Sequence, residues 1–426
     1  NHTTSPMLPR CRPPLLGRLH VSQSMAPRRL HRFLIHCSAT EKKDLERSVP
    51  VVIIGGGTVG KCLSVMLSRL GVDTLLVEQQ SRTKGENGKE PPHPHPRAHV
   101  LHTRTMEILR ELGLEQNVHH RAPPLSQWRH FRYGESILGE EFGAVDFYKG
   151  HTAKWLRAAS PATLSHLSQP ILDEILGEVI DDESRFPGEI RRLEGYRGTR
   201  FEFINEEDGE EKQDQCLDDD GALSCGRQGL QPAPATSAVS ASKEGIRGGR
   251  KRVAVTLTPS SSSSSSSTLT TSETTIISCD FLVAADGANS AFRTQLGINL
   301  EGSTALQHFV SVHFTCRDLW NRIKELQRPG MLHFVFNRNV VGVLVAHDLE
   351  EGRWVAQFPY YPPHQSAEEM TNLQTCEKMV RDCIGVEDDG SGRGGRVPQE
   401  ESNLTDDIEV HSADAWCMNA LVAESF

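Results

Sequence analysis

The pattern of apolar and polar residues first becomes regular near residue 48. A continuous apolar run over 48–54 ends in a cluster of glycines, which is typical of a buried strand that leads into a turn. Helical spacing follows over 58–70, and a second short apolar run covers 74–78. This order of strand, helix and strand predicts a parallel sheet with a helix packed against it.

Two later stretches carry apolar residues three and four positions apart. They cover 100–112 and 164–180, and each predicts an amphipathic helix. Gly113 follows the first stretch directly and would end that helix. The polar, proline-rich residues 81–97 predict a loop before it.

After residue 305 the apolar residues alternate with polar ones instead. Val310, Val312 and Phe314 show this two-residue period, which is typical of a strand with one buried face. Three more strands, separated by turn signals, are predicted at 331–336, 340–347 and 354–360. The pattern predicts an antiparallel sheet in a second domain, which is inserted within the first or follows it.

Residues 205–275 interrupt both patterns. Nine acidic residues fall within 206–220, and eight consecutive serines occupy 260–267. Such a composition buries too little apolar surface to offset the entropy lost on ordering. We therefore predict a mostly disordered insertion that contains one strand at 252–258.

Charge is distributed unevenly along the chain. The formal net charge is -10, yet residues 1–40 contain six arginines and no acidic residue. The rest of the chain is therefore strongly acidic, which argues against nucleic acid as a partner. The arginine-rich, acid-free start predicts an organellar address, mitochondrial in preference to plastid. The alternative is a disordered tail from a misassigned start, with a cytoplasmic protein.

Other features of the sequence argue against a transmembrane helix, disulfide bonds and a metal site. No apolar run reaches the ~18 residues of a transmembrane helix. The ten cysteines form no CxxC pair and no zinc-like spacing, so reduced, mostly buried thiols are expected. Four histidines gather among prolines without partner carboxylates, so surface or cofactor-side histidines are expected and no metal site: His93, His95, His99 and His102.

The turn after the first strand carries candidate cofactor chemistry. Gly55, Gly57 and Gly60 form a GxGxxG pattern between the predicted strand and helix. The first glycine allows the tight turn, the second lets the backbone approach a pyrophosphate, and the third lets the helix pack against the strand. Thr58 and Val59 begin the helix, whose free N–H groups and positive dipole end favour phosphates.

An acidic residue completes this pattern at the end of the second strand. Glu78 lies 18 residues after Gly60, where its carboxylate would accept hydrogen bonds from a ribose diol. The same negative charge would repel a 2′-phosphate, so NADP is not expected at this turn. Together these residues predict a site for the ADP half of a dinucleotide, FAD or NAD. A glycine-rich loop without a ligand is the alternative.

A second motif distinguishes between these two cofactors. An apolar run over 279–285 leads into Asp286-Gly287, and Ser290 and Arg293 follow. This arrangement resembles the FAD-dependent flavoprotein monooxygenases that hydroxylate aromatic rings, the phenol-hydroxylase-like group. The resemblance implies that Asp286 and Gly287 lie near the pyrophosphate of FAD and near the nicotinamide donor.

Two further stretches carry the same resemblance. Residues 96–107 resemble the family's Arg-Ala segment and the helix after it, which implies that Arg97 contacts phosphate or ribityl oxygens of FAD. Residues 160–169 resemble the stretch before a helix whose glutamine touches the cofactor, which implies this role for Gln169; a solvated helix residue is the alternative. The cofactor-binding residues expected from all the motifs are Gly55, Gly57, Thr58, Val59, Gly60, Glu78, Arg97, Gln169, Asp286 and Gly287.

The resemblance also implies a domain organisation. An α/β fold is expected, in which a Rossmann-like FAD-binding domain carries an inserted α+β substrate domain with an antiparallel sheet. The family's third motif, a Gly-Asp pair, is not reached before Phe426, which predicts an incomplete chain. The expected boundaries are a targeting or disordered segment 1–47, the first part of the FAD-binding domain 48–204, the insertion 205–275, the Asp-Gly segment 276–304 and the substrate-domain sheet 305–426.

The implied activity is a monooxygenase reaction. NADPH or NADH would reduce FAD, O₂ would add to the reduced flavin, and the resulting hydroperoxide would hydroxylate a small, phenol-like aromatic substrate. No catalytic residue is assigned, and four residues on the predicted strands are expected to be structural: His313, His333, Tyr360 and Tyr361. The alternatives are a quinone-pathway hydroxylase or another FAD oxidoreductase, and a non-catalytic FAD-fold relic or interaction protein.

Overall fold

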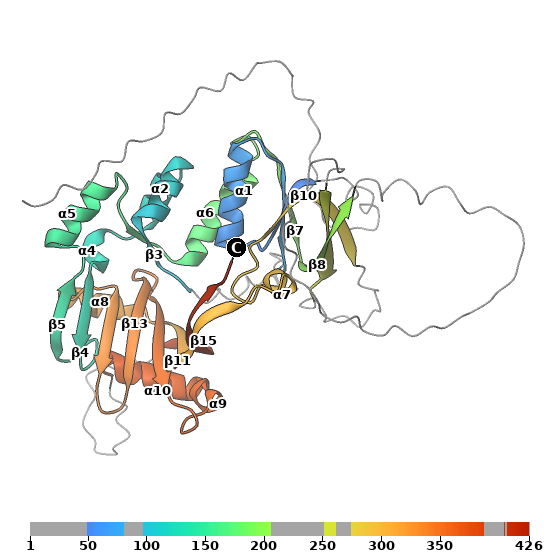
Figure 1. Ribbon diagram of the computed structural model, residues 1–426. Helices are drawn as coiled ribbons and strands as arrows, with labels where there is room; N and C mark the ends of the chain where they lie inside the picture. Colours follow the sequence, from blue (N-terminus) through green and yellow to red (C-terminus); the bar gives the residue numbers. More distant parts are fainter. Residues whose placement is uncertain are drawn as a thin grey trace, which may run out of the picture. The chain divides into compact units, whose positions relative to one another are not determined.

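The computed structural model describes residues 49–80, 97–205, 251–260, 274–386, 404 and 407–425. All of these residues lie in one unit, Cys37–Phe426. Two large β-sheets organise the described part of this unit, one of six strands and one of seven (Figure 1). Each sheet has its own apolar core and its own helices.

The six-stranded sheet contains the strands of the first apolar pattern. Its strand order is β7-β2-β1-β10-β9-β8. The strands are β1 (Val49–Ile54), β2 (Thr74–Glu78), β7 (Ile190–Glu194), β8 (Tyr196–Asn205), β9 (Lys251–Pro259) and β10 (Thr275–Ala284). The first four in spatial order run parallel, and β9 and β8 extend the sheet as antiparallel strands. Because β1 is covered on both faces, its sequence is almost continuously apolar.

Helices cover one face of this sheet and a short helix covers part of the other. The first group comprises α1 (Thr58–Arg69), α2 (Thr103–Glu111), α3 (Glu115–Arg121) and α6 (Gln169–Asp181). Its apolar side chains share one core with Val51 and Ile53 of β1. On the opposite face, Val52 and Ile54 pack in a second core with Phe292 of α7 (Ala291–Gln295). The side chains of β1 therefore alternate between two cores.

The seven-stranded sheet has the order β15-β11-β14-β13-β12-β4-β5. Its strands are β4 (His130–Gly134), β5 (Glu141–Asp146), β11 (Leu300–Thr315), β12 (Leu332–Phe336), β13 (Val341–Asp348), β14 (Arg353–Tyr360) and β15 (Glu409–Ala423). Only β12 and β4 pair in parallel; all other neighbours are antiparallel. This sheet contains the strands of the alternating apolar pattern.

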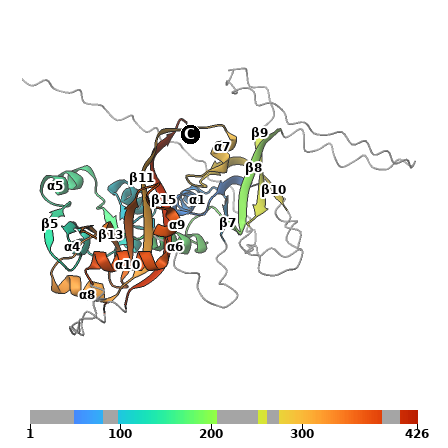
Figure 2. The same ribbon diagram turned by 90° about the horizontal axis from the view of Figure 1, so that it is seen from below.

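Helices α8 (Asp318–Glu325), α9 (Ala367–Met370) and α10 (Leu373–Ile384) accompany this sheet. Figure 2 shows α8 and α10 on one side of it. Val310 and Phe314 of β11 share a core there with Ile323 of α8 and Val380 of α10. The residues between Val310 and Phe314 alternate, so every second side chain of the strand points to the other face.

Four short elements complete the described fold. Strands β3 (Val100–Leu101) and β6 (Ser165–His166) pair with each other, and α4 (Leu125–Trp128) and α5 (Gly150–Ala159) are single helices. The two strands explain why α2 and α6 begin later than the sequence predicts. Residues 100–101 and 165–166 pair as strands rather than starting helices, and α6 begins at Gln169 with Pro170 in its first turn, where a missing N–H does no harm.

The predicted fold class is confirmed, but the second sheet draws on more of the chain than predicted. Strands β4 and β5 come from within 48–204, and β11 begins within 276–304. β4 enters the sheet by pairing with β12, far along the chain, and local apolar spacing contains no information about such a partner. The predicted strand at 252–258 is present as β9.

The segment 1–47 and most of the insertion lie outside the described residues. Among the helices that are described, none combines the length and apolar character needed to cross a bilayer.

Candidate cofactor site

The turn after β1 joins the ends of three strands. Gly55 has a φ of +107°, a left-handed conformation that glycine adopts without steric cost. Its N–H donates to Val77 O at 2.8 Å, and a Cβ at this position would overlap the carbonyl group of Ala285. The Ala285 N–H in turn donates to Ile54 O at 2.7 Å. The backbone of the turn is thus fixed against both neighbouring strands, β2 and β10.

Two later glycines of the turn differ in how closely other atoms approach them: Gly60 is tightly packed and Gly57 faces open space. A Cβ on Gly60 would overlap the carbonyl oxygen of Gly55, so α1 packs directly against the turn. A Cβ on Gly57 would meet no atom within 4 Å. Gly57 is the N-cap of α1, whose first turn contains Thr58 and the exposed Val59 and no acidic residue. An anionic group could therefore approach the N–H groups at the start of α1 without obstruction.

Glu78, at the end of β2, lies against this turn. Its Oε2 accepts a hydrogen bond from the Gly56 N–H at 2.7 Å, and its Oε1 accepts one from the Gln80 N–H at 2.9 Å. A Cβ on Gly56 would come within 2.8 Å of the Glu78 side chain, so only glycine allows this approach. Each carboxylate oxygen has a second lone pair. The carboxylate is therefore held in place and can still accept hydrogen bonds from ribose hydroxyls.

The start of α6 lies beside the start of α1. Gln169 Nε2 donates to Thr58 Oγ1 at 3.3 Å, and Thr58 Oγ1 donates to Asp173 Oδ1 at 2.5 Å. Lys61 Nζ donates to the backbone carbonyl of Asp173 at 3.1 Å. Gln169 and Asp173 lie four positions apart, on one face of a helix. Asp173 is missing from the sequence-based site, although its spacing from Gln169 is a signal that could have found it.

Arg97 lies on an exposed segment that leads into β3. Backbone hydrogen bonds join this segment to the start of α6: the Gln169 N–H donates to Ala98 O at 2.9 Å, and the Leu167 N–H donates to His99 O at 2.8 Å. Arg97 and Gln169 are distant in the sequence, but these bonds bring their segments together. The segments of Arg97, Gln169 and Thr58 therefore form one continuous region.

The Asp286-Gly287 pair follows β10 and begins a tight turn. Gly287 has a φ of +85°. Asp286 Oδ2 accepts a hydrogen bond from the Ala291 N–H at 2.9 Å, whereas Asp286 Oδ1 is buried and has no hydrogen-bond partner in the described structure. Ser290 Oγ caps α7 by accepting from the Arg293 N–H at 3.0 Å. A buried acceptor without a partner is costly, so Oδ1 fits a donor supplied by a ligand.

The motif segments converge on one edge of the six-stranded sheet. The glycine turn follows β1, Glu78 ends β2, and Asp286-Gly287 follows β10. These strands are adjacent and parallel, and ligand sites of such sheets form at the carboxyl ends of the strands. The start of α1 offers donors to a pyrophosphate, Glu78 offers acceptors to a ribose, and Asp286 Oδ1 offers an acceptor to a further donor. The residues present thus fit a dinucleotide with additional hydroxyl groups, as FAD has.

A protein family described as an FAD binding domain matches residues 48–389 of this chain. The chain belongs to this FAD-binding family. A putative polyketide hydroxylase of Streptomyces halstedii is 27% identical over 364 residues, which cover 85% of this chain and 53% of the relative. A 2,4-dichlorophenol 6-monooxygenase of Cupriavidus pinatubonensis is 34% identical over 130 residues, 30% of this chain and 20% of the relative. The resemblance to FAD-dependent aromatic-ring monooxygenases is confirmed.

Solved structures of other proteins share the fold. The flavin-dependent monooxygenase PieE, solved with FAD and substrate, superposes with a TM-score of 0.61 at 22% identity, over 89% of this chain and 51% of PieE. Aklavinone-11 hydroxylase, solved with FAD and aklavinone, gives a TM-score of 0.58 at 21% identity, over 88% of this chain and 55% of that enzyme. The chain thus spans about half the length of the relatives it matches.

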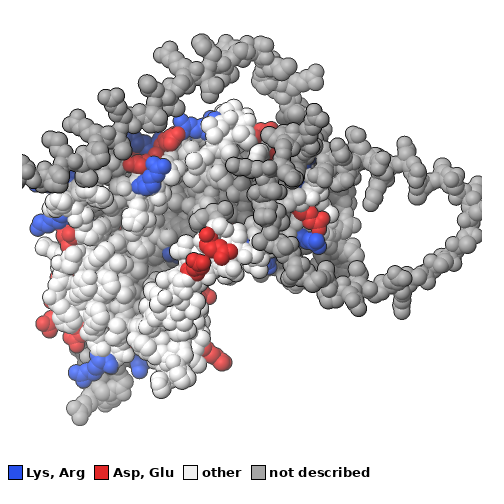
Figure 3. Space-filling model, in the orientation of Figure 1, with Lys and Arg blue, Asp and Glu red and all other residues white. Residues whose placement is uncertain are grey.

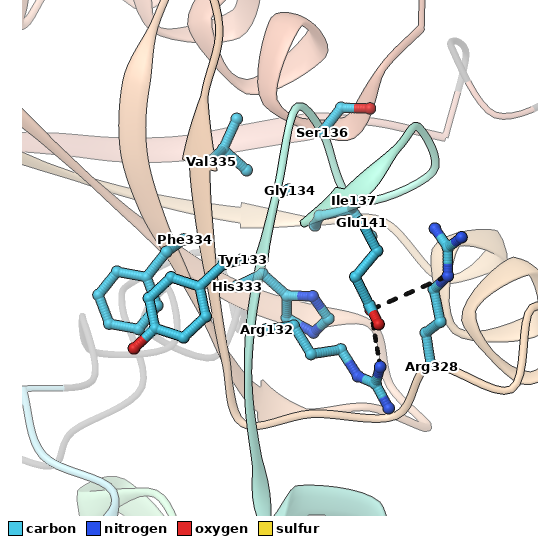
Figure 4. Close-up of a pocket in the computed structure, with 10 residues that line it drawn as sticks. All are labelled: Arg132, Tyr133, Gly134, Ser136, Ile137, Glu141, Arg328, His333, Phe334 and Val335. Atoms are coloured by element: carbon cyan, nitrogen blue, oxygen red, sulfur yellow. Dashed lines mark hydrogen bonds and ion pairs between the residues drawn. The ribbon is translucent and has the colours of Figure 1, made fainter. Parts of the chain in front are cut away.

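A pocket in the second sheet contains none of the motif residues of the FAD-binding family (Figure 4). Glu141 lies between Arg132, whose Nη1 is 2.7 Å away, and Arg328, whose Nε is 3.9 Å away. Burial lowers the pKa of the neighbouring His333 to about 4, with a further contribution from Arg132. The free space inside the pocket is about 10 Å³, which is about the room that one water molecule needs. We therefore assign the internal ion pair a structural role.

The other aromatic and histidine residues considered in the sequence have varied positions. His313 is buried on the face of the sheet opposite to the helices and contacts His411, with ring centroids 5.2 Å apart. Tyr360 is buried in the helix-covered core, and Tyr361 is exposed. None of these residues belongs to the motif segments of the candidate cofactor site. His102 is exposed, and His93 and His95 lie outside the described residues.

The described cysteines form no disulfide bonds among themselves. All six are free thiols: Cys62, Cys279, Cys316, Cys376, Cys383 and Cys417. Burial raises the pKa of Cys279 and Cys376 to about 11, so these thiols stay protonated near neutral pH and are inert. Within the described ranges, no group of three or more His, Cys, Asp or Glu side chains is arranged to hold a metal ion.

Proposed function

We propose that this protein is an FAD-dependent monooxygenase that uses NADPH or NADH and O₂ to hydroxylate an aromatic, phenol-like substrate. The observation that carries the proposal is the convergence of the glycine turn, Glu78 and the unpartnered Asp286 Oδ1 on adjacent strand ends. FAD, when bound and reduced by the nicotinamide donor, supplies the activation of O₂. The side chains of the protein bind and orient the reactants and exclude water.

Each motif segment has a distinct part in holding FAD. The start of α1, with Gly57 as its N-cap, would hold the pyrophosphate. Glu78 would accept hydrogen bonds from the adenosine ribose. Asp286 Oδ1 would accept one from a hydroxyl of the ribityl or ribose chain, and Arg97 would place a positive charge beside the phosphates.

An aromatic face on the second sheet supports an aromatic substrate. Side chains that alternate with the helix-covered core point to the opposite face of this sheet. Tyr133 and Phe334 stack there with ring centroids 4.8 Å apart (Figure 4). Phe309 and Trp416 stack in the same way at 5.1 Å, and the Trp416 indole N–H donates to Ser311 Oγ at 2.9 Å. Two stacked aromatic pairs therefore lie on one face of the sheet.

The strand register places the Tyr133–Phe334 pair in one row with Ser311, the hydrogen-bond partner of Trp416. A single cross-strand row runs from β4 to β15 through directly paired residues, namely Tyr133, Phe334, Val343, Gln357, Ser311 and Asp414. Three strand spacings separate Phe334 on β12 from Ser311 on β11, which corresponds to about 14 Å. On the side shown in Figure 3, the surface over this sheet has few charged side chains. Such a face suits planar aromatic rings.

The names of the relatives agree with this substrate class. They include putative polyketide hydroxylases, 2,4-dichlorophenol 6-monooxygenases and a phenol 2-monooxygenase. The phenol and dichlorophenol in these names are aromatic substrates. We assign the face defined by the cross-strand row to such a ring.

An activity assay tests the proposal. The chain reconstituted with FAD is given NADPH or NADH in air, with phenol or 1-naphthol as probe. We expect nicotinamide oxidation that depends on FAD, increases with the probe and yields a product heavier by one oxygen atom. Oxidation without oxygen transfer to either probe would contradict the monooxygenase assignment and favour another FAD oxidoreductase.

We also propose a mitochondrial location, supported by the arginine-rich and acid-free composition of residues 1–40. Fusion of these residues to a fluorescent protein should direct it to mitochondria. A diffuse cytoplasmic signal would contradict this proposal.

A further inference from the structure

Three histidines gather where the segments of Arg97 and Gln169 meet the seven-stranded sheet. His99 follows the Arg97 segment, His166 lies in β6, and His347 lies in β13. The ring centroids of His99 and His166 are 5.2 Å apart, as are those of His99 and His347. The Trp128 ring stacks on His166 at 5.6 Å. The proposed function gives none of these side chains a role.

The hydrogen bonds of His166 define which ring nitrogen carries the proton in His166 and which atom donates between His99 and His166. His166 Nε2 lies 2.8 Å from the carbonyl oxygen of Ala346, which can only accept, so Nε2 has the proton. In neutral His166 the Nδ1 atom then has none and accepts. His99 Nδ1 lies 3.3 Å from it and must be the donor. The chain therefore runs in one direction, from His99 through His166 to Ala346.

Burial keeps both rings neutral, and the arrangement requires a neutral ring of His166, whose Nδ1 must accept. Desolvation lowers the pKa of His166 to about 3, with a smaller contribution from His99, and lowers the pKa of His99 to about 4. The side chains that face the pair are His347 from β13 and Trp128 from α4. No carboxylate, lysine or arginine of the described chain contributes to either pKa shift. Protonation of His166 at Nδ1 would place two N–H donors opposite each other and break the chain, whereas protonation of His99 at Nε2 would leave its Nδ1 donor in place.

The same residues are attached to the cofactor segments. The carbonyl oxygens of Ala98 and His99 accept hydrogen bonds from the N–H groups of Gln169 and Leu167. Ala346, at the other end of the chain, belongs to β13, which also supplies Val343 to the cross-strand row. The pair therefore connects the segments of Arg97 and Gln169 with the sheet that has the aromatic face.

We propose that His99 and His166 are positioning residues, which fix the Arg97–Gln169 region of the cofactor site against β13 through one directed hydrogen-bond chain. The inference rests on the proposed function for the statement that this region holds FAD. The hydrogen-bonded attachment of this region to β13, called the fastening below, involves only residues of the chain. It can therefore be measured separately from cofactor binding.

Two substitutions of His166 and one control test the proposal. His166→Leu removes the donor to Ala346 and the acceptor for His99. His166→Gln keeps an amide donor within reach of Ala346 and does not titrate. His102→Gln is the matched control, since His102 is an exposed histidine a short distance along the same chain. Thermal unfolding identifies the variants that are folded at the temperature used.

Hydrogen exchange on the FAD-free chain measures the fastening. We expect the amides of Leu167 and Gln169 to exchange about tenfold faster in His166→Leu, as expected when one buried hydrogen bond is lost. His102→Gln should match the unsubstituted chain, and His166→Gln should lie closer to it than to His166→Leu. Equal protection in all folded variants would overturn the proposal. If His166→Leu does not fold, the same comparison is made with His99→Leu, which removes the donor to His166.

FAD titration then measures the consequence for the cofactor. At pH 7.5 we expect His166→Leu to bind FAD about tenfold more weakly. The FAD affinity of the unsubstituted chain should fall as the pH decreases from 6 towards 4, and His166→Gln should reduce this fall. A normal affinity and a normal pH profile in His166→Leu would overturn the positioning role. Failure of the unsubstituted chain to bind FAD would refute the proposed function instead, while the exchange data would still decide the fastening.

Discussion

The two sheets present their candidate functional residues in different ways. In the six-stranded sheet, the glycine turn and Glu78 lie within one strand-helix-strand unit, and Asp286 follows the adjacent strand directly. In the seven-stranded sheet, the cross-strand row on the aromatic face takes its residues from six strands that are scattered along the chain. Cofactor chemistry is thus encoded locally, whereas the proposed substrate surface depends on strand register.

The first prediction separates packing from ligand contact within the glycine turn. Gly60→Val would force a side chain into the carbonyl of Gly55, and we expect the free energy of unfolding to fall by more than about 3 kcal/mol. Gly143→Val, where a Cβ meets no atom within 4 Å, is the matched control. Urea unfolding of both variants measures the difference. Equal stability of the two would show that the packing described for α1 is wrong.

The second prediction concerns buried histidines in the two regions. Burial lowers the pKa of His99 to about 4, and burial with a contribution from Arg132 lowers the pKa of His333 to about 4. Below pH 6.5 the unfolded chain binds protons that the folded chain excludes, so stability should fall as the pH decreases towards 4. Each histidine should contribute at most about 2 kcal/mol of this loss at pH 5.

Urea unfolding at pH 7.5, 6 and 5 measures this dependence. His99→Gln and His333→Gln should each reduce the loss between pH 6 and pH 5, whereas His102→Gln should not. A free energy of unfolding that stays constant over this range would contradict the neutral, buried state of these rings.

The third prediction tests whether the Phe309–Trp416 stack on the aromatic face binds substrate. Trp416→Ala removes the stack on Phe309 and the hydrogen bond to Ser311. We expect about a tenfold rise in KM for 1-naphthol with unchanged FAD content, because base or ring stacking on an aromatic side chain is worth about 1–1.5 kcal/mol. Val422→Ala, on the same strand and 65% exposed, is the control. A KM that both variants leave unchanged would remove the Phe309–Trp416 stack from the substrate site.

The smallest expected effect concerns the turn after β10. Ser290→Ala removes the cap of α7 that accepts from the Arg293 N–H, which typically costs about 1 kcal/mol. We expect a stability loss of that size and a modest decrease in FAD affinity, because Asp286 accepts from the Ala291 N–H in the same turn. Ser366→Ala, which removes the corresponding cap of α9, should lower stability without changing FAD affinity.

The sequence predicts the first region well because its structure is local. The apolar runs, the GxGxxG spacing and Glu78 all occur within 48–78, and β1, α1 and β2 form as predicted. The family resemblance adds the segments of Arg97, Gln169 and Asp286. The spacing within α6 places Asp173 on the same face as Gln169, but its hydrogen bond with Thr58 depends on how α1 and α6 pack, which the sequence pattern does not determine.

The seven-stranded sheet was only partly predictable, because its strand pairing joins residues that are far apart in the sequence. The strands at 331–336, 340–347 and 354–360 have clear alternation, and they correspond to β12, β13 and β14. The membership of β4 and β5 depends on parallel pairing with β12, and the stack of Trp416 on Phe309 depends on the register of β15 against β11. The contact between His99 and His166 likewise joins residues that are far apart in the sequence.

The central claim is that the edge formed by β1, β2 and β10 holds FAD. Titration of the FAD-free chain with FAD, compared between the unsubstituted protein, Gly57→Val and Gly143→Val, tests it most directly. We predict that Gly57→Val weakens FAD binding by about 100-fold or more, because a side chain there displaces the pyrophosphate from several N–H donors. Its thermal stability and that of Gly143→Val should stay close to normal, and Gly143→Val should bind FAD normally. Equal FAD affinity in all three proteins would contradict the account.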